Sequence, residues 1–263
     1  MRLSHKGQFF FTILASKILS LNKVLLFLLL LSSEIIYSQN DSVSITKYAI
    51  PSHFESFISM MDSSVKNAFV FCVNTTDSIV VLTFDDGPLA MTKNITDTLK
   101  QYKCPAAFFV ITKNISEKNV SYYLDTLFTL SIHGYTHSNY TKLSYNEVEK
   151  EIKGSKDILL ENGITPKYFR PPYGAFDCKT VKIMQDYQLK GILWNIDSYD
   201  WNGYAGEKLV DRVLEYTVPG SIVLFHERIH TEDLKKIIIG LRSMGYRMVS
   251  LDELLQYPAC PPP

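Results

Sequence analysis

Two adjacent carboxylates stand where a buried strand should end. Asp85 and Asp86 follow the apolar, β-branched run 78–82, and Gly87 and Pro88 after them must end the strand. Neighbouring side chains on a strand point in opposite directions, so a bend here would give the two carboxylates different tasks. One can bind a metal ion while the other acts as a base. The alternative is a turn whose aspartates only cap a helix.

Two histidines follow a second expected strand. His133 and His137 come after the apolar run 128–132, and their i, i+4 spacing puts two imidazoles on one side of a helical turn. Together with one of the aspartates they would form a three-ligand site with open positions, as catalytic zinc requires. An H-x-x-x-H pair alone is a weak signal, but its place after a strand matches that of the carboxylate pair.

These side chains need a fold that brings several strand ends together. Short apolar runs alternate with amphipathic stretches over about 180 residues, which predicts an α/β fold with a parallel sheet, open or closed into a barrel. About seven strands would make an incomplete relative of the eight-stranded barrel, in which chemistry gathers at the carboxyl ends of the strands. The expected strands are 78–84, 106–111, 128–132, 168–169, 190–195, 221–225 and 246–249.

Two helices between these strands have clear sequence signals. Ser144 and Glu147 have the spacing of a capping box, and a second amphipathic stretch starts near Thr231. The buried faces are expected to carry Val148, Ile152, Ser155 and Leu159 in the first helix, and Leu234, Ile237, Ile238 and Leu241 in the second.

Three more expected strand ends carry polar side chains. Arg170 precedes the stiff loop 171–174, the segment 197–201 reads Asp-Ser-Tyr-Asp-Trp, and His226 directly follows the run 221–225. Arg170 alone would be read as a surface arginine beside a rigid turn. Chance could place any one of these groups at the same edge of a sheet, but hardly all of them.

The five segments together resemble the motifs of the polysaccharide deacetylase family, also described as NodB-homology domains or carbohydrate esterase family 4. They occur in the family's order within residues 78–256. They are 83–88, 133–137, 170–174, 197–201 and 224–226. The resemblance implies a distorted (β/α)7-type barrel, the NodB-homology fold. It also implies a metal-dependent hydrolase that removes N-acetyl groups from N-acetylglucosamine units of chitin or peptidoglycan and releases acetate.

The resemblance further implies a role for each motif residue. Asp85 matches the general base and Arg170 the cation paired with it, because a positive neighbour favours a charged carboxylate. His226 matches the general acid and Asp200 the carboxylate that keeps it charged. The remaining matches are Asp86, His133 and His137 as ligands of a divalent metal (zinc, with cobalt as a substitute), the backbone N–H of Tyr173 as oxyanion donor, and Tyr173, Trp201 and Leu224 as substrate-binding walls.

One position departs from the family pattern. Gly134 stands directly after the first histidine, where the family usually has Ser or Thr. The loop therefore loses a hydroxyl that could steady it, although no ligand is lost.

Three alternative functions remain open at this point. The segment 226–230 spells the H-E-x-x-H pattern of zinc proteases, but that pattern needs one continuous helix, and His226 follows a strand-like run. A protease would depend on Glu227 and not on Asp85, whereas a deacetylase would depend on Asp85 and not on Glu227. The second alternative is an O-acetyl xylan esterase of the same family. The third is a non-catalytic carbohydrate-binding module of the same fold.

Composition narrows the class of partner. The chain has 263 residues, 46% of them apolar, which is enough for one sizeable domain plus small extras. Its formal net charge is zero, so there is no electrostatic argument for binding nucleic acid. The family resemblance implies a polysaccharide as the partner.

The first 38 residues have the order of a secretory signal, with basic residues, then the apolar run 24–31, then small and polar residues up to Ser38. A signal-anchor is the alternative. The protein would then be secreted or held at the cell surface or wall, and would touch the membrane only through an uncleaved anchor. The expected parts of the chain are 1–38 as signal, 39–77 as spacer or N-terminal cover, 78–256 as catalytic domain and 257–263 as C-terminal tail.

The cysteines leave their pairing open. In a secreted chain, four cysteines can form two disulfides in three ways, and free buried cysteines are an equally good alternative. None shows C-x-x-C spacing, which argues against a thiolate zinc site. They are Cys72, Cys104, Cys178 and Cys260.

Overall fold

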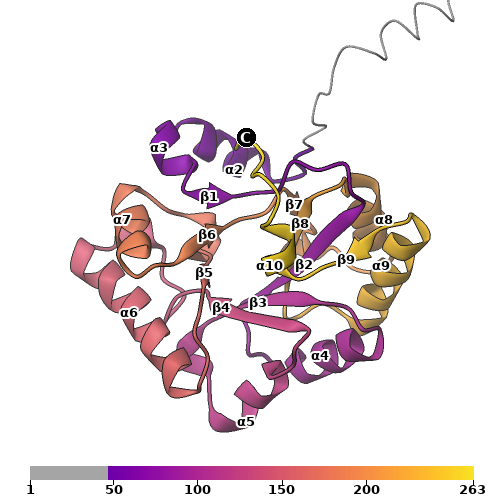
Figure 1. Ribbon diagram of the computed structural model, residues 1–263, viewed down its shortest axis with the longest axis horizontal. Coiled ribbons are helices and arrows are strands. Elements are labelled where there is room, and N and C mark those ends of the chain that lie inside the picture. Colours follow the sequence, from indigo (N-terminus) through magenta and orange to yellow (C-terminus); the bar gives the residue numbers. More distant parts are fainter. Residues whose placement is uncertain (1–46) are drawn as a thin grey trace, which may run out of the picture. The chain divides into compact units, whose positions relative to one another are not determined.

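The computed structural model describes residues 47–263, so the expected signal segment lies outside the described residues. Within them, parallel strands form a curled sheet, and helices surround it on the outside (Figure 1). The strands are β1 (Phe69–Val70), β2 (Ile79–Asp85), β3 (Ala106–Val110), β4 (Phe128–Ile132), β5 (Tyr168–Phe169), β6 (Lys190–Ile192), β7 (Ile196–Asp197), β8 (Ser221–His226) and β9 (Arg247–Met248).

The strand order is β1-β6-β5-β4-β3-β2-β8-β7, with β9 also paired to β2. Every pairing between these strands is parallel. All residues of β2 are buried, which explains why its sequence is an unbroken apolar, β-branched run up to the carboxylates. The predicted α/β fold is confirmed, with the sheet curled into a half-barrel.

The helices follow the sequence signals closely. The expected capping box between Ser144 and Glu147 opens α6, and the side chains predicted for the buried faces of α6 and α9 are buried. The helices are α2 (Ser52–Ser59), α3 (Ser63–Lys66), α4 (Thr92–Gln101), α5 (Glu117–Val120), α6 (Tyr145–Glu161), α7 (Cys178–Asp186), α8 (Glu207–Tyr216), α9 (Thr231–Ser243) and α10 (Leu251–Leu254). None of the helices in this part of the chain is long and apolar enough to cross a membrane.

The single strand expected at 190–195 is wrong in its extent, because β6 ends at Ile192 and the next strand, β7, begins only at Ile196. Between them the chain leaves one pairing and joins another: Leu193 donates its N–H to Val70, and Asn195 donates to Ile222. The carbonyl oxygens of Ile192 and Leu193 accept hydrogen bonds from the Arg170 guanidinium. Two carbonyls at the end of β6 thus bind a distant side chain, which no local pattern reports.

Residues 47–77 belong to the same body as the sheet. β1 pairs with β6, and Ala49 forms a bridge with Ile196 at β7. Cys72 forms a bridge with Ser221 and a disulfide with Cys260, which ties the segment after β1 to the last residues of the chain. The expected cover and tail thus contribute pairings to the sheet and its rim. Cys104 and Cys178 are free.

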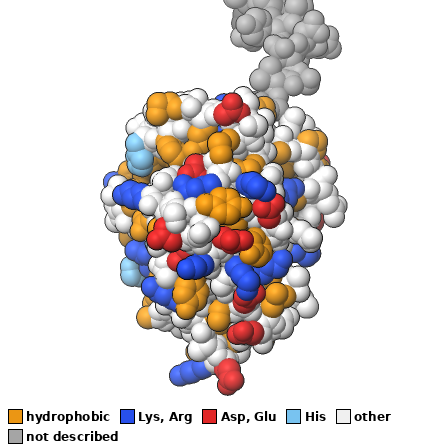
Figure 2. Space-filling view, turned by 90° about the vertical axis from the view of Figure 1, so that its left-hand side faces the viewer, with side chains coloured by type: hydrophobic (Ala, Val, Ile, Leu, Met, Phe, Trp, Pro, Cys, Tyr) orange, Lys and Arg blue, Asp and Glu red, His pale blue; other side chains and the backbone are white. Residues whose placement is uncertain are grey.

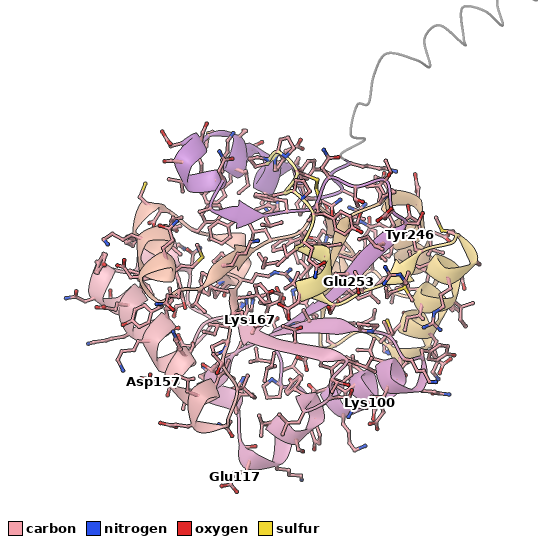
Figure 3. All side chains as sticks on the ribbon, in the orientation of Figure 1. Lys100, Glu117, Asp157, Lys167, Tyr246 and Glu253 are labelled. Atoms are coloured by element: carbon pink, nitrogen blue, oxygen red, sulfur yellow. A yellow bond between two sulfur atoms is a disulfide. The ribbon has the colours of Figure 1, made fainter. Side chains whose placement is uncertain are left out.

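The amino-terminal end of the barrel is covered by α10, which lies over its centre in Figure 1. Lys167, just before β5, pairs with Asp252 at 3.1 Å, and Arg247 at the start of β9 pairs with Glu253 at 2.6 Å. Figure 3 labels Glu253 on this helix and Lys167 beside it. The carboxyl ends of the strands lie at the opposite end, where a functional site is expected in this type of fold.

The surface around α6 and α7 is finely mixed in charge. Figure 2 shows acidic and basic side chains interspersed on this side of the molecule. Part of this mixture is i, i+4 pairs, with Lys153 2.5 Å from Asp157 on α6 and Lys182 2.9 Å from Asp186 on α7. Such exposed pairs contribute little to helix stability, because water and salt screen them.

Candidate active site

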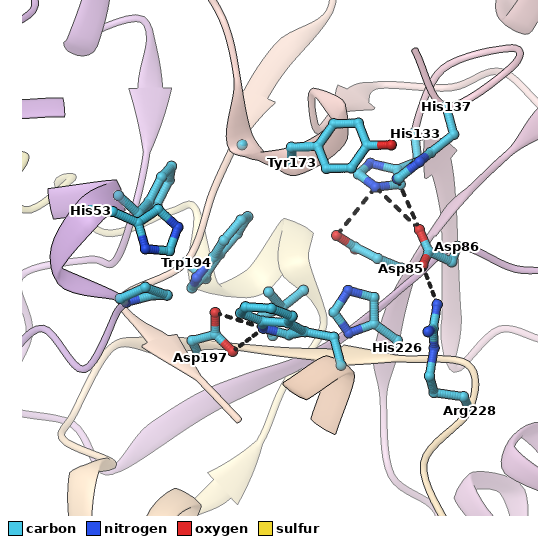
Figure 4. Close-up of a pocket in the computed structure, with 15 residues that line it drawn as sticks. His53, Asp85, Asp86, His133, His137, Tyr173, Trp194, Asp197, His226 and Arg228 are labelled. Atoms are coloured by element: carbon cyan, nitrogen blue, oxygen red, sulfur yellow. Dashed lines mark hydrogen bonds and ion pairs between the residues drawn. The ribbon is translucent and has the colours of Figure 1, made fainter. Parts of the chain in front are cut away.

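A cavity of about 420 Å³ opens at the carboxyl ends of β2, β4 and β8. Figure 4 shows it from within, with side chains converging from several strand ends. Eight of the ten residues predicted from the sequence line it. They are Asp85, Asp86, His133, His137, Tyr173, Trp201, Leu224 and His226.

Strand register explains why distant residues meet here. Asp85 on β2 pairs directly with His226 on β8. Ile132 on β4 pairs with Phe169 on β5, so His133 and Arg170 follow at the same level. Asp86 has the left-handed φ of +72°, so the chain turns between the two carboxylates. The expected bend is therefore present, and the two side chains have different partners.

Asp86, His133 and His137 form the cluster that suits a metal ion. One ligand atom from each lies within 4.8 Å of the others. Asp86 Oδ1 is 3.1 Å from His137 Nε2 and 3.7 Å from His133 Nε2 (dashed in Figure 4). This oxygen is buried, and it accepts no hydrogen bond from any described residue. A buried acceptor without a donor is costly unless a cation fills the place, so the residues fit a metal.

The hydrogen bonds around the cluster select its donor atoms. His133 Nδ1 lies 2.8 Å from the carbonyl oxygen of Arg170 and donates to it, which leaves Nε2 with its lone pair toward the cluster. Burial lowers the pKa of His133, which favours the neutral imidazole that a metal requires. The second oxygen of Asp86 lies 2.6 Å from Arg228 Nη2, so Oδ1 alone is left to the histidines.

Asp85 is a buried carboxylate that is held from one side. Its Oδ1 accepts a hydrogen bond of 2.8 Å from Arg170 Nη1, and its Oδ2 lies 3.6 Å from His133 Nε2. Arg170 does not line the cavity, because it is fully buried beneath Asp85. It also donates to Thr83, and its guanidinium carbon lies 4.1 Å from the centroid of the Phe109 ring. The geometry leaves one oxygen of Asp85 turned toward the histidine cluster.

His226 is paired with Asp200 behind it. The distance from His226 Nδ1 to Asp200 Oδ1 is 2.7 Å, and the other carboxylate oxygen accepts from the His226 backbone N–H at 2.7 Å. Burial lowers the pKa of His226, but the hydrogen bond and the charge of Asp200 outweigh burial and raise this pKa above its ordinary value. The structure thus places a histidine biased toward its charged form in the cavity.

The three expected substrate walls lie at the cavity mouth and floor. Tyr173 has a φ of +61° and is 63% exposed, and its ring centroid lies 4.6 Å from that of His137. Trp201 is 43% exposed and donates from Nε1 to Asp197 at 3.1 Å. Leu224 is buried and pairs with Asp197 across the sheet. An aromatic rim over an apolar floor suits a sugar ring with a small acyl group.

Several cavity residues received no role from the sequence. Phe54 stacks on Trp194 with centroids 5.0 Å apart, and a Cβ on Gly174 would come within 2.5 Å of the Phe54 ring. Burial raises the pKa of Asp197 to about 6. Gly174 and Asp197 lie within the motif segments 170–174 and 197–201 but received no role there. No motif indicates Phe54, because α2 precedes the first expected strand and its contacts are made far along the chain. The additional lining residues are Pro51, His53, Phe54, Gly174, Trp194, Asp197 and Arg228.

The H-E-x-x-H segment does not form a protease site. His226 ends β8, whereas His230 precedes α9 and is exposed, so the two histidines share no helix. Glu227 is completely buried away from the cavity and accepts hydrogen bonds from Tyr123 at 3.0 and 2.9 Å. This arrangement lacks the shared helical face that the motif needs.

Comparison with known proteins agrees with this geometry. The family model described as polysaccharide deacetylase matches residues 73–192. A peptidoglycan-N-acetylglucosamine deacetylase of Bacillus cereus is 31% identical over 201 residues, covering 73% of each chain. A peptidoglycan-N-acetylmuramic acid deacetylase of Bacillus subtilis is 32% identical over 193 residues, which are 69% of this chain but 40% of that protein.

Solved structures show the same fold. A peptidoglycan N-acetylglucosamine deacetylase in complex with a hydroxamate-type ligand superposes with a TM-score of 0.67 at 30% identity, covering 73% of this chain and 94% of that one. A CE4 family pseudoenzyme from Bacillus anthracis has a TM-score of 0.65 at 28% identity, covering 71% and 68%. From its fold, its site and these relatives, the chain belongs to the polysaccharide deacetylase family, carbohydrate esterase family 4.

Proposed function

We propose that the protein is a metal-dependent hydrolase that removes N-acetyl groups from N-acetylglucosamine units of a cell-wall polysaccharide and releases acetate. One observation carries the proposal: a cluster that fits a metal, a buried carboxylate–arginine pair and a histidine–carboxylate pair all meet at one cavity. Peptidoglycan is the first choice of polymer, because two similar relatives are named for it. Chitin offers the same acetylated sugar.

Asp86, His133 and His137 would hold the ion. When bound, the ion polarises the acetyl carbonyl and makes the attacking water more acidic. Two imidazoles and one carboxylate form a donor set that suits zinc, with cobalt as a substitute.

The chain's own residues would then move the protons. Asp85 takes a proton from the water whose oxygen bonds to the acetyl carbon, while Arg170 holds the carboxylate in place. The backbone N–H of Tyr173 stabilises the developing oxyanion. His226 gives its proton to the sugar nitrogen as the carbon–nitrogen bond breaks, and Asp200 keeps that histidine charged beforehand. The products are acetate and a free amine.

A complete residue set favours catalysis over sugar binding alone. The family contains a pseudoenzyme of the same fold, so fold by itself does not imply activity. In this chain each predicted partner is present and within hydrogen-bonding or ligand distance of its neighbour. That completeness is the reason to propose an enzyme. An O-acetyl xylan esterase would use the same groups, since ester and amide carbonyls need the same activation.

Metal removal tests the chemistry. The protein would be made metal-free with a chelator, verified by elemental analysis, and assayed for acetate release with and without added zinc or cobalt. Activity that is lost on removal and restored by either ion supports the proposal. Undiminished acetate release from verified metal-free protein would refute it.

We also propose that residues 1–38 direct the protein out of the cell and that residues 78–256 contain the catalytic machinery, with 39–77 and 257–263 around it. Access to a wall polymer requires such export. Fractionation of cells producing the full chain tests it, together with the N-terminal sequence of the mature protein. Retention of the full chain inside the cell would contradict it.

A further inference from the structure

The loop that joins the two clustered histidines has an unusual backbone. His133 directly follows β4, and the chain reaches His137 within one short turn. Gly134 has a φ of +86° and His137 a φ of +67°, both in the left-handed region. For a histidine that region is strained, so the conformation persists only if neighbouring groups hold it. One side of the metal cluster therefore depends on whatever holds this loop.

Glu151 on α6 is the group that holds it. Its Oε2 accepts hydrogen bonds from the backbone N–H groups of Tyr135, at 2.8 Å, and Thr136, at 2.9 Å. Its Oε1 accepts from the Thr136 hydroxyl at 2.5 Å. One carboxylate thus binds three donors, all between the two histidines. Hydrogen bonds to a charged acceptor are about twice as strong as neutral ones.

The helix fixes where this carboxylate stands. Ser155, one turn later, donates to the backbone carbonyl of Glu151 at 2.8 Å and accepts from Thr112 at 3.0 Å. The next residue on α6, Ile152, is completely buried. Glu151 therefore sits at the edge of the packed face of α6. No Lys or Arg within residues 47–263 forms an ion pair with it, so its charge is directed at the loop.

Gly134 allows the close approach. A Cβ at this position would lie 3.0 Å from the Tyr140 hydroxyl and 3.5 Å from Glu151 Oε2. The hydroxyl that the family pattern usually has here would have to occupy this space. In this chain the stabilising group comes from α6 instead.

We propose that Glu151 is a positioning residue that sets the metal affinity of the site by fixing the backbone between His133 and His137. It does not touch the ion or the reacting atoms. The inference rests on the metal site of the proposed function, but not on the identity of the substrate. It assigns a role to a carboxylate outside the five motifs.

The test measures zinc binding by metal-free protein, with a chelating indicator as competitor. Glu151→Gln keeps the size of the side chain but removes its charge and turns an amide group toward three donors. Zinc affinity is expected to fall by about 10–100-fold, the usual effect of losing a group that orients a ligand. The matched control is Glu161→Gln, an exposed glutamate at the end of the same helix, which should bind zinc like the unmodified protein.

A purely structural role gives a different result. It would lower the unfolding temperature of the metal-free protein and leave the zinc affinity of the folded protein unchanged, and that outcome overturns the proposal. If Glu151→Gln does not fold, the zinc affinity of Thr136→Val is measured instead, because this change removes only one of the three hydrogen-bond donors to Glu151. A smaller loss of affinity in folded Thr136→Val supports the proposal, and an unchanged affinity overturns it. Zinc binding without acetate release would count against the proposed function. It would not affect the comparison of zinc affinity between the variants and the unmodified protein.

Discussion

Arg170 and Asp85 form an ion pair that is almost wholly shielded from water, with Nη1 2.8 Å from Oδ1 and exposed fractions of 0% and 2%. Taking both charges out of water is costly, and the pair is stable only because each charge has further partners. The guanidinium also donates to Thr83 and to the carbonyls of Ile192 and Leu193. The base of the proposed reaction is therefore held by the same residue that binds the two carbonyls at the end of β6.

Replacing Arg170 by leucine should destabilise the protein strongly. The change leaves Asp85 charged and buried without a cation, which typically costs about 3–5 kcal/mol. Urea unfolding at pH 7 measures the free energy of unfolding, with Arg228→Leu as a control, because Arg228 pairs with Asp86 at the half-exposed cavity rim. A loss below about 1 kcal/mol, the range of exposed pairs, would contradict this account of the pair.

The Asp200→Asn variant should lose activity at high pH first. Asp200 outweighs burial and raises the pKa of His226, so the charged acid persists above its ordinary pKa near 6.5. The same raised pKa means that this pair stabilises the fold fully below the unfolded value, and that the stabilisation is lost as pH rises through the folded pKa. Without the carboxylate the alkaline limb of kcat/KM should move to lower pH. If the alkaline limb of the kcat/KM profile stays at the same pH in Asp200→Asn, His226 is not the titrating acid.

Glu227→Gln should keep activity and change the pH dependence of stability. Burial, reinforced by the charges of Asp85 and Asp86, raises the pKa of Glu227 to about 8 from 4.5. The folded state therefore keeps a proton that the unfolded state releases, and the free energy of unfolding falls by about 1.4 kcal/mol per pH unit inside that window. Urea unfolding at several pH values should show that the free energy of unfolding depends less on pH in the variant. Loss of acetate release in a folded variant would show that the reaction itself needs Glu227, which contradicts its assignment as a purely structural residue.

His53→Ala should affect substrate binding more than chemistry. His53 is exposed on α2 and lines the cavity, whereas the catalytic groups come from strand ends. Loss of a contact made equally in ground and transition states raises KM and leaves kcat unchanged. Kinetics on N-acetylglucosamine oligomers of increasing length would show a several-fold higher KM. Ser52→Ala, an exposed neighbour outside the cavity, is the control, and a main loss in kcat would contradict the assignment.

Local signals predicted the elements and the placement of most site residues. The capping box and the periodic apolar face of α6 depend on residues within one helix, and the structure confirms both. The carboxylates and histidines follow apolar runs directly, so the rule that parallel strands end at one edge brings them together. Eight predicted residues line the cavity for that reason.

Other features depend on contacts between distant parts of the chain. Phe54 meets Trp194 only after the sheet curls, and Glu151 reaches Tyr135 and Thr136 only after α6 packs on the barrel. The pairing of Cys72 with Cys260 depends on the same closure. Neither periodicity nor spacing carries this information, because each contact requires the finished fold.

The most direct test of the central claim is acetate release by purified residues 39–263 with added zinc. The substrates would be peptidoglycan, N-acetylglucosamine oligomers and acetylated xylan, and Asp85→Asn would be assayed beside the unmodified protein. We expect acetate release from a polymer that contains N-acetylglucosamine, and we expect Asp85→Asn to abolish this release while zinc binding remains. Release from xylan alone would make the protein an ester hydrolase. No release from any substrate by folded, zinc-loaded protein, or equal release by Asp85→Asn, would contradict the proposed reaction.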